Sequence, residues 1–197
     1  FPRVMERARQ EQENDRAFES QFAFVKTKIT ETRNGSGDVK KHEEQISTNN
    51  PALKKLDRPA RDPDQATPNS NRRSNDRKKA TEKVELQLDN DLMKRFEFTL
   101  VGRETLNGRP ALVVDFVPAR GKLPERNFKD KFINKTAGRV WLDEEELAII
   151  KAALRLTDRV NVWGGLVGAV WKLDFGFERE RTDDGLWYPR EASFHLE

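Results

Sequence analysis

The sequence predicts an α+β fold built on a curved antiparallel sheet with a large apolar face. Two apolar-patterned runs within residues 96–118 meet at Asn107-Gly108, a dipeptide that tolerates the positive φ angles of tight hairpin turns. A second pair of such runs is split at Asp143-Glu144. All four Trp and the single Tyr follow residue 140, inside this pattern or just after it.

The composition indicates one folded domain with a concentrated polar region. The chain has 197 residues, 36% of them charged, and a mean hydropathy of -0.89, yet it contains 12 Phe and 4 Trp. A net charge of +3 is too small to imply a nucleic-acid partner. The absence of Cys excludes disulfides, thiolate metal sites and cysteine nucleophiles. Because the chain begins with Phe1 and not Met, we expect a processed or trimmed form.

The first residues predict a surface helix followed by a hairpin. Residues 2–16 are rich in helix formers, with opposite charges at helical spacing. Residues 17–32 alternate in polarity and carry β-branched side chains, which favours a strand. A turn at 34–37 leads to a polar returning strand at 38–48, whose charges suit the edge of a sheet.

A long polar segment interrupts the pattern at residues 57–83. It contains no Val, Ile, Leu, Met, Phe, Trp or Tyr, and three prolines break it. Such a segment cannot bury enough apolar surface to offset the entropy lost on ordering, so we expect a mobile loop. Its basic end could contact phosphate, but no aromatic residues are interleaved with the bases, which favours a solvated loop.

An amphipathic helix over residues 84–96 and the central hairpin come next. The apolar stripe of the helix recurs every four positions, at Val84, Leu88, Leu92 and Phe96. Strands are predicted at 96–104 and 109–118. Alternation places two apolar sets on matching faces of these strands: Phe96, Phe98 and Leu100 on the first, and Leu112, Val114 and Phe116 on the second.

The remaining elements extend the sheet. Residues 125–138 predict a short helix ending at Gly138, and strands at 139–143 and 147–157 form the next hairpin. Two long strands then meet at a turn over 183–185. One side of the first long strand carries an apolar row: Val167, Ala169, Trp171, Leu173, Phe175 and Phe177.

Few residues suggest chemistry. The four consecutive acids at 143–146 lie at a predicted turn, where they would point in different directions into water, unlike a catalytic carboxylate pair held at fixed spacing. His42 and His195 lack the spacing of zinc ligands. No nucleophile elbow or phosphate-binding glycine motif occurs. We therefore predict no enzymatic activity, no metal and no cofactor.

The apolar face has two interpretations. Large apolar side chains on one face of a sheet are usually core packed against helices. Only three short helical segments are predicted to cover this long sheet, which leaves room for an incompletely filled cavity. Both interpretations stay open on the sequence.

Three segments resemble the LolA/LolB-like outer-membrane lipoprotein-sorting family of Gram-negative envelopes. They are the hairpin at 98–118, GRVWLDEEELAIIKAALRL at 138–156 and DDGLWYPRE at 183–191. The resemblance covers about half of the chain. It implies a strongly curved antiparallel sheet that forms an unclosed β-barrel, with its open side covered by a few helices and a cavity that accepts lipid acyl chains.

On this resemblance, we expect a periplasmic protein, associated with the outer membrane or its surface, that binds lipid or lipoprotein acyl chains without catalysis. The alternative is an envelope interaction or stress-signalling module that binds a partner protein. The residues expected to line the apolar cavity are Phe96, Phe98, Leu100, Leu112, Val114, Phe116, Val140, Leu142, Val167, Trp171, Leu173, Phe175 and Phe177.

Overall fold

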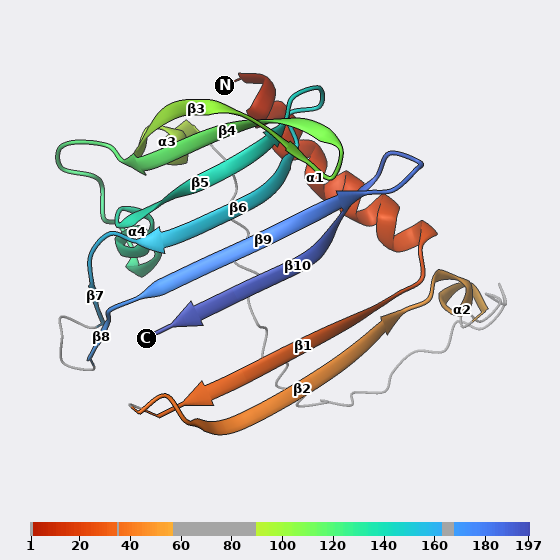
Figure 1. Cartoon of the computed structure of the whole chain (residues 1–197), viewed down its shortest axis with the longest axis horizontal. Helices are drawn as coiled ribbons and strands as arrows, with labels where there is room; N and C mark the ends of the chain where they lie inside the picture. Colours follow the sequence, from red (N-terminus) through yellow and green to blue (C-terminus); the bar gives the residue numbers. More distant parts are fainter. Residues whose placement is uncertain (1, 35, 57–89, 163–167) are drawn as a thin grey trace, which may run out of the picture. The chain divides into compact units, whose positions relative to one another are not determined.

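The computed structural model describes residues 2–34, 36–56, 90–162 and 168–197 (Figure 1). By its internal contacts the chain divides into two compact units, one of residues 1–18 with 86–197 and one of residues 19–85. Each unit is considered by itself. The expected single domain stays a prediction, and the polar segment at 57–83 lies outside the described residues.

The described elements are one long helix, three short helices and ten strands. The smaller unit contains β1 Phe24–Arg33, β2 Val39–Asn49 and α2 Pro51–Leu56. Helix α1, Pro2–Gln21, precedes them and belongs to the larger unit up to Phe18. The larger unit continues with α3 Asn90–Met93, β3 Phe96–Leu106, β4 Arg109–Pro118, α4 Phe128–Ile133, β5 Thr136–Asp143, β6 Ile149–Leu156, β7 Val160–Val162, β8 Gly168–Val170, β9 Leu173–Arg181 and β10 Trp187–Leu196.

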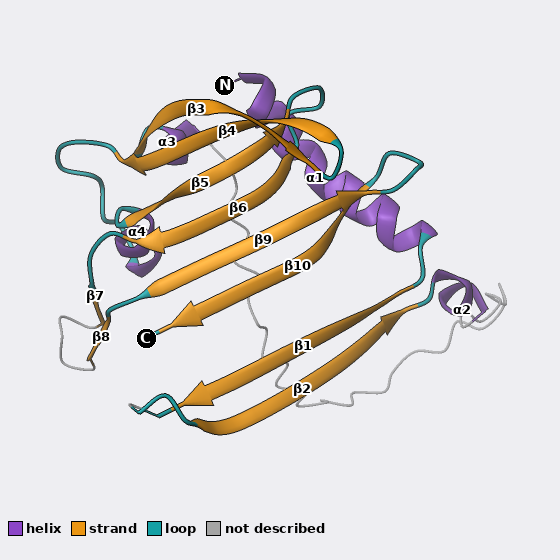
Figure 2. Cartoon of the chain, viewed as in Figure 1, coloured by secondary structure: helices purple, strands orange, loops and turns teal. Residues whose placement is uncertain are grey.

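A six-stranded sheet of order β10-β9-β6-β5-β4-β3 forms the larger unit, and every neighbouring pair is antiparallel (Figure 2). The α+β class and the antiparallel sheet are therefore confirmed. The sheet is neither closed nor strongly curled: β3 and β10 end it and do not pair with each other. Closure would require continuous tilt and stagger of the strands, whereas this sheet has only local bulges.

The central hairpin forms at the predicted dipeptide. Asn107 and Gly108 have φ angles of 50° and 77°, as a two-residue turn of type I′ requires. Leu106 pairs with Arg109 across this turn. The turn sets the register from Leu106 to Gly102, and the bulge between Leu100 and Gly102 then shifts it by one residue, so that Phe98 lies opposite Phe116.

The register aligns apolar residues in rows that cross the whole sheet. One row runs from β3 to β10 through Phe98, Phe116, Gly138, Leu154, Phe175 and Phe194. The next row contains Leu100, Val114, Val140, Ala152, Phe177 and Ala192. Paired residues of neighbouring strands share a face, so these rows make one continuous apolar face.

Gly138 lies inside the first apolar row for a steric reason. A Cβ built at this position would lie 2.3 Å from the main-chain oxygen of Ala153 and 3.0 Å from the side chain of Leu154. Strands β5 and β6 can therefore keep their separation here only with glycine. The helix predicted to end at Gly138 is shorter in the structure: α4 ends at Ile133 with Asn134 as its C-cap, and β5 begins at Thr136, which pairs with Leu156.

Helix α1 holds the ends of β9 and β10. Asn14 is buried, and its side chain accepts a hydrogen bond from the N–H of Trp187 at 2.9 Å and donates to its carbonyl at 2.5 Å. Buried Arg179 forms ion pairs with Glu11 and Asp15 of the helix. Trp187 is 2% exposed and packs with Ala111, Ala148 and Ile150.

Three sequence predictions differ from the structure. Residues 17–21 continue α1 and are not strand, since Phe18 stacks on Tyr188 at 5.0 Å. Of the predicted helix 84–96, residues 84–89 lie outside the described residues, α3 covers residues 90–93, and Phe96 already begins β3. The first long strand is interrupted: β8 pairs with β7, and β9 starts only at Leu173. Val167 lies outside the described residues.

The smaller unit is a long hairpin, as its sequence predicts. Strands β1 and β2 pair from Phe24 with Asn49 to Arg33 with Val39. The Asn34 side chain accepts hydrogen bonds from the N–H groups of Ser36 and Asp38 and orders the turn. At the other end, the buried Asn49 amide donates to the carbonyls of Glu19 and Phe22, both at 2.8 Å.

Candidate functional site

The apolar face of the larger sheet brings together most of the predicted cavity residues. The rings of Phe96 and Phe116 lie 5.1 Å apart, and those of Phe175 and Phe177 lie 5.9 Å apart. Phe116 and Leu142 are buried. The partly exposed residues of the predicted cavity are Phe96, Phe98, Leu112, Val114, Val140, Leu173, Phe175 and Phe177.

Two of the predicted cavity residues are mostly exposed. Leu100 and Trp171 each expose 64% of their surface, and so does Phe194, a neighbour on the face that the sequence did not single out. Trp171 lies between β8 and β9, and its N–H donates to the carbonyl of Glu197. The exposed members of the face thus lie on the edge strands β3 and β10 and just before β9, whereas its buried members Phe116 and Leu142 lie on the inner strands β4 and β5.

The described helices of the larger unit offer little cover for this face. Apart from α1, they are α3 with four residues and α4 with six. The strands that carry the apolar rows have between eight and eleven residues each. Within the described part of the chain, helical surface is therefore scarce relative to apolar sheet surface.

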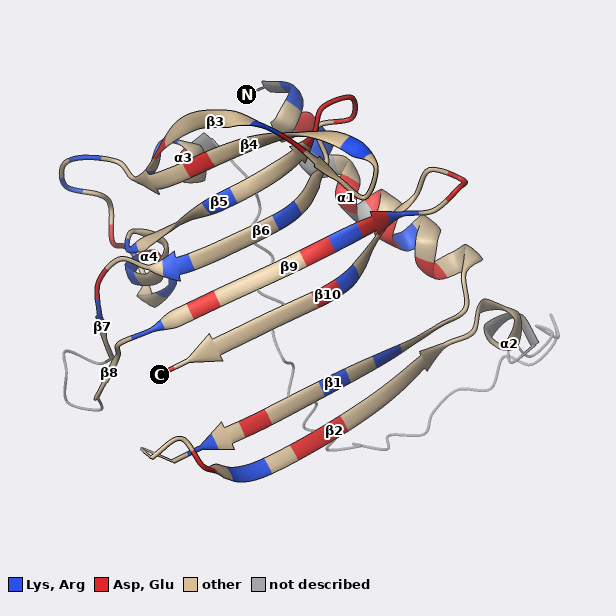
Figure 3. Cartoon of the chain, viewed as in Figure 1, with Lys and Arg blue, Asp and Glu red and all other residues tan. Residues whose placement is uncertain are grey.

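A hollow of about 730 Å³ lies on the opposite, polar face of the sheet. Its floor is a row of small residues, Ala153, Gly176 and Ser193, which are paired across β6, β9 and β10. Charged side chains line its sides, and Figure 3 shows residues of both signs along these strands. Sequence analysis missed this hollow, because it depends on which residues the register places side by side.

The charges of the polar hollow are partly paired. Arg139 holds Asp115 through two hydrogen bonds of 2.6 and 2.9 Å. These bonds lower the pKa of Asp115 below its usual value. Arg155 also lines the hollow and forms no ion pair with a carboxylate of the described residues.

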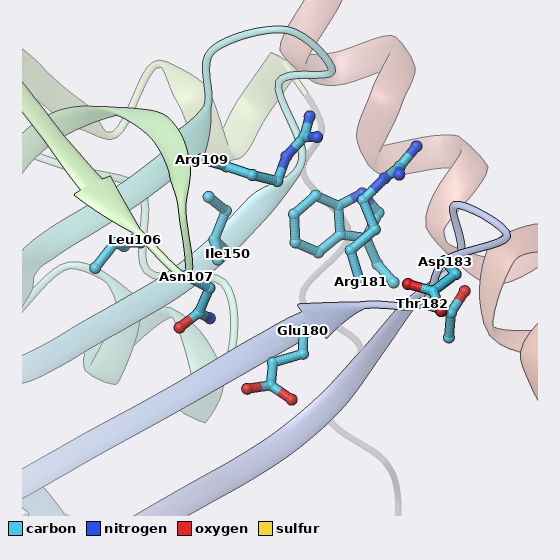
Figure 4. A pocket seen from close by; sticks show the side chains of 9 residues that line it. Leu106, Asn107, Arg109, Ile150, Glu180, Arg181, Thr182 and Asp183 are labelled. Atoms are coloured by element: carbon cyan, nitrogen blue, oxygen red, sulfur yellow. The ribbon is translucent and has the colours of Figure 1, made fainter.

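A second hollow, of about 340 Å³, lies where β3 and β9 end and where β4, β6 and β10 begin, beside the hairpin turns (Figure 4). Trp187 and Ile150 form its apolar wall, and the guanidinium groups of Arg109 and Arg181 lie beside them. Arg181 pairs with Glu146 at 2.8 Å, and the indole N–H of Trp187 donates to the same carboxylate at 2.8 Å.

The acidic turn beside this hollow corrects a sequence prediction. Asp143 has no exposed surface, so the interpretation of all four acids as solvated was wrong for this residue. Arg109 donates to its carboxylate at 2.6 and 3.1 Å. The main-chain N–H groups of Glu145 and Glu146 donate to the same carboxylate, at 3.1 and 2.8 Å.

The pKa of Asp143 results from opposing causes. Burial raises it, because the charged form loses water. The hydrogen bonds from Arg109 and from the N–H groups of Glu146 and Glu145 outweigh burial, and the net pKa lies below the usual value. The carboxylate of Asp143 in turn raises the pKa of Arg109. With these bonds Asp143 fixes the turn between β5 and β6 and offers no proton for catalysis.

The described residues hold no cluster of metal-ligating side chains, and their two histidines lie on the surface. No group of three or more His, Asp or Glu side chains in these ranges could hold a metal ion. His42 faces Glu31 at 3.4 Å, His195 lies 4.0 Å from Glu197, and both imidazoles are more than half exposed. None of the helices in the described ranges has the length and apolar character needed to cross a bilayer.

We compared the chain with family models, with curated proteins and with solved structures, and nothing matched.

Proposed function

We propose that the larger unit, in the manner of LolA/LolB-like proteins, binds lipid or lipoprotein acyl chains on the apolar face of its open sheet, without catalysis, in the periplasm. The observation that carries the proposal is the pair of apolar rows that cross all six strands in register. Since the sheet is open, the acyl chain would lie between this face and whatever covers it.

The chemistry of the face suits an acyl chain. Each buried methylene contributes about 0.8 kcal/mol, so affinity comes from apolar area and needs no placed polar group. The rings of Phe98, Phe116 and Phe175 offer this area at half-buried or buried positions. In the described residues, the charged clusters lie at the strand ends or on the polar face and are engaged in ion pairs such as Arg109 with Asp143.

A pair of variants on β10 tests the proposal. Phe194 belongs to the apolar face and is 64% exposed, whereas its neighbour Ser193 belongs to the polar face. After mild delipidation and incubation with phospholipid, native mass spectrometry should detect retained lipid on the wild type and on Ser193→Glu. We expect Phe194→Glu to retain far less lipid, because a carboxylate on the face repels the apolar chain.

A third variant separates a cavity from a filled core. Phe175 is half-buried in the middle of the first apolar row. If the face binds lipid, Phe175→Glu should fold, with an unchanged far-ultraviolet circular dichroism spectrum, and lose the lipid. Unfolding of Phe175→Glu together with no lipid on the wild type would show that the face is only core, and the proposal would be rejected.

One observation favours a second candidate, an envelope interaction or stress-signalling module. The 730 Å³ hollow lies on the polar face, where Arg155 has no carboxylate ion pair among the described residues. A partner protein with an acidic side chain would suit this position. Retention of a protein partner that Arg155→Glu abolishes, with no lipid bound to the wild type, would support this candidate over the first.

A further inference from the structure

Three large apolar side chains are exposed at one end of the sheet, and we call them the C-terminal patch. They are Trp171, Phe194 and Leu196, which expose 64%, 64% and 52% of their surface. Leu196 pairs with Leu173 across β9 and β10, and Phe194 pairs with Phe175. The main chain of Trp171 and Lys172 bonds to Glu197, so the patch is continuous with the apolar face.

A guanidinium group lies directly on this patch. The Cζ atom of Arg159 is 5.1 Å from the ring centroid of Trp171. This cation–π contact places a positive guanidinium group next to the apolar indole ring. Trp together with Arg or Lys is typical of side chains at the interface between a bilayer and water.

Some of the charged side chains around the patch form ion pairs and others do not. Lys135 pairs with Asp158 at 2.8 Å, and Lys172 pairs with Asp174 at 3.3 Å. Arg159 forms no ion pair with a carboxylate of the described chain. Its positive charge beside the patch is therefore left for an outside anion.

The size of the patch argues against a protein partner. A large side chain such as an aromatic one has roughly 150–250 Å² of surface to bury. At their observed exposure, Trp171, Phe194 and Leu196 together offer an apolar area on the order of 350 Å². A stable protein interface needs about 800 Å² on each partner. A bilayer accepts a small apolar patch, because a few inserted side chains and a few basic groups suffice for reversible binding.

We propose that the C-terminal patch, with Arg159, docks the protein reversibly on the surface of an anionic phospholipid bilayer. The indole of Trp171 and the side chains of Phe194 and Leu196 enter the interfacial layer, while Arg159 contacts lipid phosphate. This docking brings the open end of the apolar face to the membrane. The purpose of this docking rests on the proposed function, whereas the vesicle experiment tests the docking without assuming that function.

Vesicle flotation tests the docking with a matched pair of variants. Leu196 and Val101 are exposed to a similar extent, 52% and 51%, but Val101 lies on β3 at the other edge of the sheet. With vesicles of phosphatidylcholine and phosphatidylglycerol, the wild type and Val101→Ser should float equally. Binding should fall on the order of tenfold for Trp171→Ser, and by several-fold for Leu196→Ser.

The charge of Arg159 has its own control in Arg120, another exposed arginine. Arg159→Gln should weaken binding to the anionic vesicles about fivefold and leave the weaker binding to pure phosphatidylcholine unchanged, whereas Arg120→Gln should match the wild type. Equal losses in the control variants, or a wild type that does not float, would overturn the docking. A dimer in sedimentation equilibrium that Trp171→Ser dissolves would assign the patch to a second copy instead.

The two proposals can fail separately. A wild type that retains lipid in native mass spectra but does not float refutes the docking surface alone. A wild type that floats in the predicted manner but retains no lipid refutes the carrier function alone.

Discussion

Replacement of the buried carboxylate of Asp143 by an amide should destabilise the protein strongly. Asp143→Asn keeps the shape of the side chain and an oxygen that can accept from the N–H groups of Glu145 and Glu146. Its new NH₂ group, however, faces the guanidinium of Arg109, which now donates to the carboxylate at 2.6 and 3.1 Å. The variant therefore loses the 2.6 Å bond from the Arg109 Nε atom, and the remaining bond from Nη2 goes to a neutral amide oxygen, at a residue with no exposed surface.

The size of the effect follows from these contacts. A hydrogen bond to a charged group contributes roughly 1.5–3 kcal/mol, and removal of one partner of a buried ion pair costs about 3–5 kcal/mol. Arg109 keeps a second carboxylate, Glu145 at 2.9 Å, which limits the loss. We expect the free energy of unfolding to fall by about 2–4 kcal/mol, measured by urea denaturation at neutral pH.

The sheet contains a matched control. Asp115 accepts two hydrogen bonds from Arg139, at 2.6 and 2.9 Å, but both side chains are about 40% exposed, at 40% and 39%. Water already screens this pair, so Asp115→Asn should change the stability only slightly. Equal losses for the two variants would refute the argument that burial gives the Asp143 pair its strength.

Acid provides a second check on Asp143. Its folded pKa is lowered, so the stabilisation is complete above the unfolded pKa of about 3.9 and is lost as the pH falls through the folded pKa. The difference between the wild type and Asp143→Asn should therefore be constant near neutral pH and shrink below about pH 4. A difference that stays constant into strong acid would contradict this account.

Two further predictions concern packing. Asn14→Ala should lower the free energy of unfolding by about 2–3 kcal/mol, because the buried N–H of Trp187 loses its acceptor and the carbonyl of Trp187 keeps only a 3.5 Å bond from Arg179. The exposed variant Glu13→Ala should not lower it, and equal urea midpoints for the two variants would refute the docking of α1. Gly138→Ala should lower the melting temperature sharply, because the new Cβ would meet the oxygen of Ala153 at 2.3 Å. Gly102→Ala is the control, because its Cβ would meet nothing within 4 Å. Similar melting curves for the two variants would show that β5 and β6 can separate without cost.

The central hairpin was predictable because its causes are local. Asn107-Gly108 sets the turn and the register next to it, and alternation groups the apolar residues of each strand on one face. The pairing of Phe98 with Phe116 depends in addition on the bulge between Leu100 and Gly102, which alternation does not reveal. The same holds for the hairpin of β5 and β6. The confirmed pairings of these hairpins place the predicted residues of β3, β4 and β5 on one apolar face.

The burial of Asp143 could not be predicted, because it depends on a partner far away in the chain. Arg109 lies 34 residues earlier and reaches the carboxylate only through the pairing of β4 with β5. A run of four acids gives no sign that the first of them is enclosed. An arginine directly after a hairpin turn, matched by an acid at the end of the next strand, is the signal that could have indicated the pair.

The curvature of the sheet also lay beyond the sequence pattern. Apolar alternation is the same in a flat, curved or closed sheet, whereas curl depends on bulges and on the stagger between strands. The bulges here, at Leu100/Gly102, Trp141/Leu142 and Pro189/Glu191, lie on different strands and do not curl the sheet strongly. The polar hollow was missed for a similar reason, since Gly176 and Ser193 meet only through the register of β9 and β10.

Photocrosslinking can show which face of the sheet holds a bound acyl chain. The delipidated protein would be incubated with a photoreactive fatty acid, irradiated, and mapped by tandem mass spectrometry. The account predicts adducts on apolar-face residues such as Val114, Leu154 and Phe175, and none on their neighbours Asp115 and Ser193 on the polar face. Adducts concentrated on the polar face, or no adduct at all, would contradict it.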